Sequence, residues 1–222
     1  MVKLSTSRKM RELAHMLNLH KSEVASFNLP CGYTCPMAHE CKSMADRVTG
    51  RITDGAHTKF RCYGASLEAV FPSVRAIHWG NYETLINSNN MVDTISSLIT
   101  DRIKVMRIHS FGDFFTKKYF NAWLEVASRF PKISFFGYTK VLPYLKVNRP
   151  SNMALVYSCG GKLDNMLTNE PYSKVVKSIA DADGLGLPAS CQINPADDYN
   201  YIIAQKPFAL VIHGIQPAKR AA

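Results

Sequence analysis

Cysteines are the most reactive side chains of this chain, and four of its six lie close together near the N-terminus. Cys31, Cys35, Cys41 and Cys62 are separated by three, five and twenty residues. Cysteines chosen only as small core residues would rarely cluster in this way. Because a reducing cytosol also disfavours disulfides, the clustering predicts that these four thiols bind a metal centre.

The spacing of these cysteines bears on the kind of metal. Zinc knuckles use Cys-x-x-Cys pairs, and the chain has none. The spacing therefore argues against a zinc site but does not exclude one. Wider, uneven spacing suits a 4Fe–4S cluster, in which three thiolates leave one iron open for a further ligand. We therefore predict a 4Fe–4S cofactor, with zinc as the alternative and S-adenosylmethionine as a possible ligand of the open iron.

Polar residues also follow the expected strands of the chain, one strand after another. In parallel α/β folds, the carboxyl ends of the strands converge on one face, where the chemistry takes place. The catalytic candidates at these positions are His109, Asp113, Lys140 and Cys159, and the candidates for cofactor binding are Ser110, Gly112, Asp113 and Thr139. Cys191 and His213 occupy similar positions near the C-terminus.

Each of these residues also has a purely structural interpretation. His109 could be a core histidine, and Asp113 could cap a helix that begins near residue 116. Cys159 and Cys191 could be small core residues, and the Gly160–Gly161 pair could simply make a turn. Their shared position at successive strand ends favours a functional site.

The elements that would position these residues follow a β/α pattern. Residues 104–109 and 133–138 are expected to be strands on either side of an amphipathic helix over 116–129, which makes a parallel βαβ unit. Further strands are expected at 24–29, 153–157, near 189 and at 208–213, and further helices at 7–19, 82–102 with a break at 87–90, and 172–180. We predict one α/β domain over residues 1–222. Its parallel sheet would curl into a partial or full (β/α) barrel, with a cysteine-rich insertion at about 31–65 that forms an excursion or hairpin.

Composition and charge restrict the partners. Lys and Arg number 27 against 17 Asp and Glu, and the net charge of +10 favours an anionic partner such as nucleic acid, although the basic residues are scattered. No apolar run approaches the length of a membrane span, and the polar N-terminus is unlike a signal peptide. We therefore expect a cytoplasmic protein that does not bind membranes.

Four segments occur in an order that resembles a known family. They are residues 34–41 (TCPMAHEC), 61–65 (RCYGA), 107–115 (RIHSFGDFF) and 136–140 (FGYTK). This order is similar to that of the phage and plasmid family called gene product 88, in which Cys-Pro-x-Ala-x-x-x-Cys and Cys-Tyr precede strands that end in His-x-Ser-Gly-Asp-Phe-like and Tyr-Thr motifs. The resemblance covers about residues 27–165 and implies a phage protein acting in an infected bacterium.

The resemblance also implies a ligand set. It assigns the metal to Cys35, Cys41 and Cys62 and leaves Cys31 as a fourth ligand or a bystander. The chain departs from the family in the polar insertion between Cys41 and Cys62. It departs again in having only Cys191 in place of a cysteine-rich C-terminal segment.

The order of elements is also similar, more weakly, to that of radical S-adenosylmethionine enzymes. Phe111-Gly112-Asp113 stands where those enzymes have Gly-Gly-Glu, so that Asp113 would accept hydrogen bonds from the methionyl amino group. The leading hypothesis is an iron–sulfur enzyme of phage origin that acts on nucleic acid or nucleotides. The rivals are a non-catalytic, zinc-stabilised protein that binds nucleic acid and a host-takeover protein that inhibits a bacterial partner.

Overall fold

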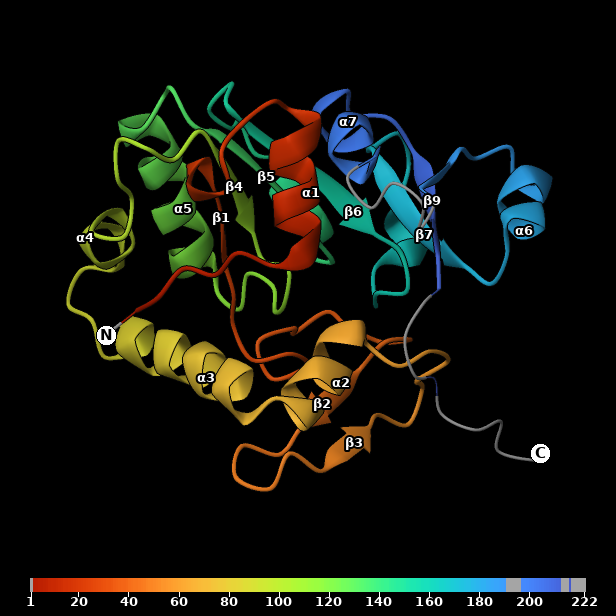
Figure 1. Cartoon of the computed structure of the whole chain (residues 1–222). Coiled ribbons are helices and arrows are strands. Elements are labelled where there is room, and N and C mark those ends of the chain that lie inside the picture. The colour runs from red at the N-terminus through yellow and green to blue at the C-terminus, as the bar shows by residue number, and fades with distance from the viewer. Residues whose placement is uncertain (1, 191–196, 213–215, 217–222) are drawn as a thin grey trace.

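A seven-stranded, all-parallel sheet organises the computed structural model, which describes residues 2–190, 197–212 and 216. The strand order is β1-β4-β5-β6-β7-β9-β8, and the sheet is curled into a half-barrel (Figure 1). The strands are β1 (Val24–Phe27), β4 (Val105–Ile108), β5 (Ser134–Thr139), β6 (Met153–Ser158), β7 (Tyr172–Val176), β8 (Ala189–Ser190) and β9 (Phe208–Val211). Within the described part of the chain the barrel is therefore partial, with β1 and β8 as its edges.

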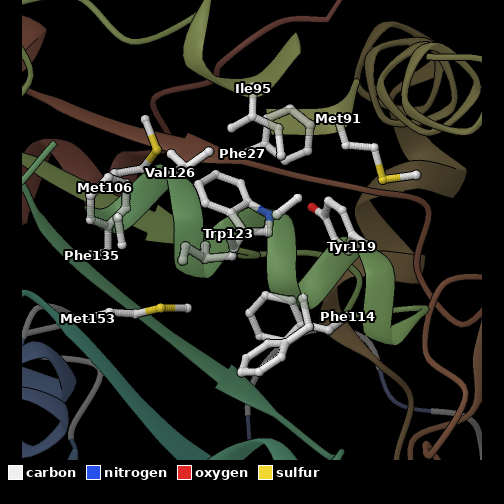
Figure 2. Packing of buried hydrophobic residues seen from close by; sticks show 14 of the residues in the cluster. Phe27, Met91, Ile95, Met106, Phe114, Tyr119, Trp123, Val126, Phe135 and Met153 are labelled. Carbon is white, nitrogen blue, oxygen red and sulfur yellow. The ribbon is translucent and has the colours of Figure 1, made fainter. Parts of the chain in front are cut away.

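Helices cover both faces of the sheet. On one face, α1 (Arg8–Met16) packs against β1, and α7 (Asp197–Ile203) packs against β5 and β6. On the other, α5 (Lys117–Arg129) and α4 (Met91–Ser96) enclose the largest apolar core. Figure 2 shows Trp123 of α5 within this core, where its ring meets Phe27 edge to face at 5.6 Å. None of the described helices is long and apolar enough to cross a membrane.

A third layer lies beyond the carboxyl ends of the strands, below the sheet in Figure 1. It contains α2 (Tyr63–Val70), α3 (Pro72–Ile86) and a separate antiparallel hairpin of β2 (Ser43–Ala45) and β3 (Ile52–Asp54). We call residues 31–70 the cysteine layer, because this segment carries the four clustered cysteines. The remaining short elements are α6 (Ile179–Gly184) and the 3-10 helices Lys21–Glu23, Leu142–Lys146 and Asp164–Met166.

Most of the expected elements are confirmed. These include the βαβ unit made by β4, α5 and β5, the excursion formed as a hairpin, and the break at 87–90, where the Asn90 side chain caps α4. The expected helix over 172–180 is wrong. Residues 172–176 form β7, a short strand with Ser173 and Val176 buried, and the capping box at Ser178 starts α6. The two adjacent, β-branched valines favour a strand, and parallel pairing with β9 prevails over local helical spacing.

Candidate functional site at the carboxyl ends of the strands

Strand β1 delivers Cys31 to the cysteine layer, and α2 fixes it there. Glu68 of α2 is fully buried, and its carboxylate accepts the Cys31 amide at 3.0 and 3.3 Å. The same carboxylate lies 2.6 Å from Nδ1 of His78 on α3. Gly64 makes this approach possible, because a Cβ there would lie 2.2 Å from the Cys31 sulfur. The first turn of α2 is thus pressed against the thiol.

The segment that carries the next two cysteines is held from both sides. Nζ of Lys42 donates to the carbonyl oxygens of Gly32 at 2.5 Å and Cys35 at 3.1 Å. The amide of Glu40 donates to the carbonyl of Gly160 at 2.9 Å. This loop therefore lies against the turn that follows β6, at the mouth of the half-barrel.

Cys31 and Cys62 form a hydrogen-bonded pair of unequal thiols. The hydrogen bond from Cys31 is the main cause that lowers the pKa of Cys62 to about 7, and the backbone amides of Ala65 and Gly64 at the start of α2 lower it further. The same hydrogen bond, followed by burial, raises the pKa of Cys31. A thiol with this environment at a helix N-terminus has the character of a thiolate and of a metal ligand.

Cys35 and Cys41 lie near this pair. Burial is the main cause that raises the pKa of both thiols, that of Cys41 to about 11. Asp113 raises both pKa values further, whereas the ammonium group of Lys140 lowers that of Cys41. The four thiols therefore share one neighbourhood with two of the predicted strand-end residues.

The donor types in this neighbourhood suit a soft metal centre. Five cysteines, the four of the cluster and Cys159, are free thiols, and thiolates with amide hydrogen bonds are the ligands of zinc and of iron–sulfur clusters. Among the described residues, however, no group of three or more His, Cys, Asp or Glu side chains is arranged to hold a metal ion. The described site is thus a set of neighbouring thiols, most of them protonated, and metal binding would have to displace their protons.

Asp113 joins the ends of β4 and β5. Its Oδ1 accepts the Thr139 hydroxyl at 2.8 Å and the Phe114 amide at 2.7 Å, and its Oδ2 accepts the Lys140 amide at 2.9 Å. Burial raises its pKa, and these hydrogen bonds act in the opposite direction. The helix-cap interpretation of Asp113 is wrong, because Thr116 caps α5. By accepting three hydrogen bonds, the Asp113 carboxylate holds the segment after β4 against the end of β5.

Lys140 connects the end of β5 to the end of β6. Its Nζ donates to the carbonyl oxygens of Ser158 at 2.7 Å and Cys159 at 2.6 Å. Burial is the main cause that raises the pKa of Cys159 to about 11. The amides of Gly160 and Gly161 donate to the carboxylate of Asp164, so the two glycines form a closed turn, as the structural interpretation expects.

His109 is placed differently from the other strand-end residues. Its ring is buried against Phe114 and Tyr119 on the α5 side of the sheet, and its Nε2 lies 2.8 Å from the Tyr119 hydroxyl oxygen. Burial lowers its pKa to about 3, so the imidazole is neutral. Its φ of 64° is a backbone conformation that residues other than glycine rarely adopt. These contacts match the interpretation as a core histidine.

Asn28 shapes the loop between His109 and Asp113. Its Oδ1 accepts the amides of Ser110 at 2.8 Å and Phe111 at 3.3 Å. Gly112 has a φ of 88°, and a Cβ there would lie 2.7 Å from Cβ of Leu29. The structure therefore holds the predicted cofactor-binding loop against the segment that leads into the cysteine layer.

The sequence interpretation missed the residues that support the site, namely Asn28, Lys42, Glu68 and His78. One signal was available, since Glu68 is the only charged residue in the otherwise apolar or small stretch of α2. Cys191 and His213 lie outside the described residues.

The comparison with known families bears on the whole chain. The family model described as Gene product 88 matches residues 3–222. The chain belongs to the gene product 88 family. Two curated relatives, each named Gene 88 protein, come from Mycobacterium phages D29 and L5. Each is 28% identical over 177 residues, which cover 71% of this chain and 67% of the relative.

The gene product 88 match extends the motif resemblance from its central segments to almost the full chain. It therefore includes the half-barrel and the cysteine layer together. No solved structure matches the chain.

Proposed function

We propose that this protein is a phage-encoded iron–sulfur protein whose clustered cysteines hold a 4Fe–4S cluster at the mouth of the half-barrel. The observation that carries the proposal is the convergence of thiols from separate segments. One follows β1, two lie in the next loop, and one stands at the start of α2. They lie near one another beyond the carboxyl ends of the strands, where parallel α/β folds place their chemistry.

The four thiols would have different roles. Cys35, Cys41 and Cys62 would be ligands, with Cys62 the most readily deprotonated because the hydrogen bond from Cys31 and, after it, the helix-terminal amides lower its pKa. Cys31 would be a fourth ligand or would stabilise the Cys62 thiolate through their hydrogen bond. Zinc remains the alternative metal, because the thiol donor set suits it as well.

We further propose that the cluster serves a reaction of the radical S-adenosylmethionine type on nucleic acid or nucleotides. When bound, the cluster would supply the electron for reductive cleavage of the cofactor. The chain itself would orient the ligand through the loop of Ser110 and Gly112 and through Thr139. Asp113 and Lys140 would act as positioning residues, because their polar groups already join three strand ends. Cys159 and His109 would lie beside and behind this loop.

Anaerobic reconstitution with iron and sulfide tests the metal assignment. The wild type should become brown and hold iron and sulfide in near-stoichiometric amounts. Cys35→Ala, Cys41→Ala and Cys62→Ala should each lose the cluster absorbance, and Cys31→Ala should lose less. Cys159→Ala is the matched control, a free thiol outside the cluster, and it should retain full iron content. Equal iron content in all five variants would contradict the site.

The reduced, reconstituted protein should then be assayed for methionine and 5′-deoxyadenosine, with and without nucleic acid. A cluster that never cleaves S-adenosylmethionine would refute the radical reaction and leave an iron–sulfur protein of another function. A colourless protein that contains zinc would instead support a non-catalytic alternative. The protein would then bind nucleic acid through its positive charge, +10 overall, or would bind and inhibit a bacterial partner.

A further inference from the structure

A cluster of charged side chains lies on the sheet face that α1 and α7 cover, outside the cysteine layer. At its centre is Asp198 at the start of α7, which is 1% exposed. Its Oδ2 accepts Nζ of Lys9 at 2.6 Å and the Tyr138 hydroxyl at 2.5 Å. Nη1 of Arg107 lies 4.0 Å from the same oxygen. Residues from α1, β4, β5 and α7 therefore meet at one carboxylate.

The charges of this cluster do not balance. Lys9 and Arg107 bring two positive charges to one carboxylate, and the other acidic group near Lys9, Glu12, is paired with Arg8 at 2.8 Å. The Arg107 side chain is only 12% exposed, and its Nε has no hydrogen-bond partner among the described residues. Desolvation by burial also lowers the pKa of Lys9. A surplus positive charge held away from water is costly unless an anion compensates it.

Arg107 is also fixed in orientation. Its guanidinium lies over the ring of Tyr138, with 5.1 Å to the ring centroid. Its orientation is therefore set by the protein, and a planar guanidinium suits the oxygens of a phosphate. The Lys9 ammonium lies 2.6 Å from the Asp198 oxygen that Arg107 approaches at 4.0 Å, so the two cations are close to each other.

We propose that Arg107 and Lys9 bind the terminal phosphate of a nucleotide or of a nucleic-acid strand end. The restricted exposure of Arg107 favours a terminal phosphate over the continuous backbone of a strand. Arg107 and Tyr138 stand one residue before the ends of β4 and β5, so the rest of the ligand would extend toward the cysteine layer. The proposal rests on the proposed function and deepens it by naming its substrate class, but phosphate binding itself does not require the iron–sulfur cluster.

Titration of the metal-free full chain with inorganic phosphate and with a nucleoside 5′-monophosphate, followed by calorimetry, tests this site. The wild type should bind both saturably at moderate salt. Arg107→Met and Lys9→Met should each weaken binding at least about tenfold, the loss expected for one charge-assisted contact. Arg11→Met is the matched control, because it removes an exposed positive charge from the same helix and should change binding less than about twofold.

Two single-stranded oligonucleotides of the same sequence, one with and one without a 5′-phosphate, distinguish the sources of the phosphate. Tighter binding of the 5′-phosphorylated oligonucleotide, lost in Arg107→Met, assigns the site to the ends of nucleic-acid chains. Binding of the mononucleotide alone assigns it to free nucleotides. Absence of saturable binding, or an equal loss in Arg11→Met, would overturn the proposal. If Arg107→Met fails to fold by circular dichroism, Lys9→Met decides, since its side chain is 30% exposed.

Discussion

The half-barrel and the cysteine layer are held together by different forces. The half-barrel is built on large apolar side chains, with Phe27, Trp123 and Phe135 fully buried between the sheet and α5. The cysteine layer contributes Cys31 and Ala65 to a small apolar cluster that Phe111, from the loop after β4, completes. Its shape depends instead on directional hydrogen bonds from buried polar groups. Hydrophobic burial therefore defines the scaffold without a metal, whereas the geometry of the thiols depends on a few polar contacts.

The largest effect is expected from Trp123→Ala in the half-barrel. Removing this fully buried ring leaves a cavity and should lower the free energy of unfolding by about 3 to 5 kcal/mol. The loss should appear equally in metal-free and reconstituted protein, measured by denaturant unfolding with far-UV circular dichroism. Glu125→Ala, an exposed change on the same helix, should stay within about 0.5 kcal/mol. A small effect of Trp123→Ala would contradict the view that α5 anchors the scaffold.

Glu68→Ala should act mainly on the cysteine layer. It leaves the Cys31 amide and His78 without their buried partner, which should cost about 3 kcal/mol of local stability. Hydrogen exchange should show faster exchange over residues 31–70, while β4, β5 and β6 keep their protection. Glu68→Gln retains an acceptor for the Cys31 amide and should cost less. Uniform loss of protection across the sheet would show instead that layer and barrel unfold as one unit.

The same contrast explains what the sequence could predict. Helix α5 and strands β4 and β5 follow from apolar periodicity, which reports burial directly. The helix expected over the short strand β7 is wrong, because five residues carry too little periodicity to distinguish a strand from a helix. The helix α7 was not expected, and α2 was missed because its small residues give no amphipathic stripe.

For the candidate site, sequence reasoning named candidate reactive groups but not the side chains that hold them in place. The cysteines and the strand-end residues stand out by type and position alone. The contact of Glu68 with Cys31 joins residues 37 apart, and that of Asn28 with Ser110 joins residues 82 apart. Such pairs depend on the tertiary arrangement, so no local sequence pattern predicts them. Asp113 follows β4 as expected, and its three hydrogen bonds become visible only in the structure.

The smallest effect on stability is expected at the junction of the two regions, from Ser110→Ala. The buried Oγ of Ser110 has no hydrogen-bond partner among the described residues, while its amide is held by Asn28. Removing an unsatisfied hydroxyl should change the free energy of unfolding by no more than about 0.5 kcal/mol, whereas Asn28→Ala, which strips two loop amides of their acceptor, should cost about 1 to 3 kcal/mol. If Ser110 contacts the ligand, Ser110→Ala should still weaken S-adenosylmethionine binding by the reconstituted protein about tenfold, measured by equilibrium dialysis. Unchanged binding together with unchanged stability would remove Ser110 from the site and place ligand contacts on the Thr139 side of the strand ends.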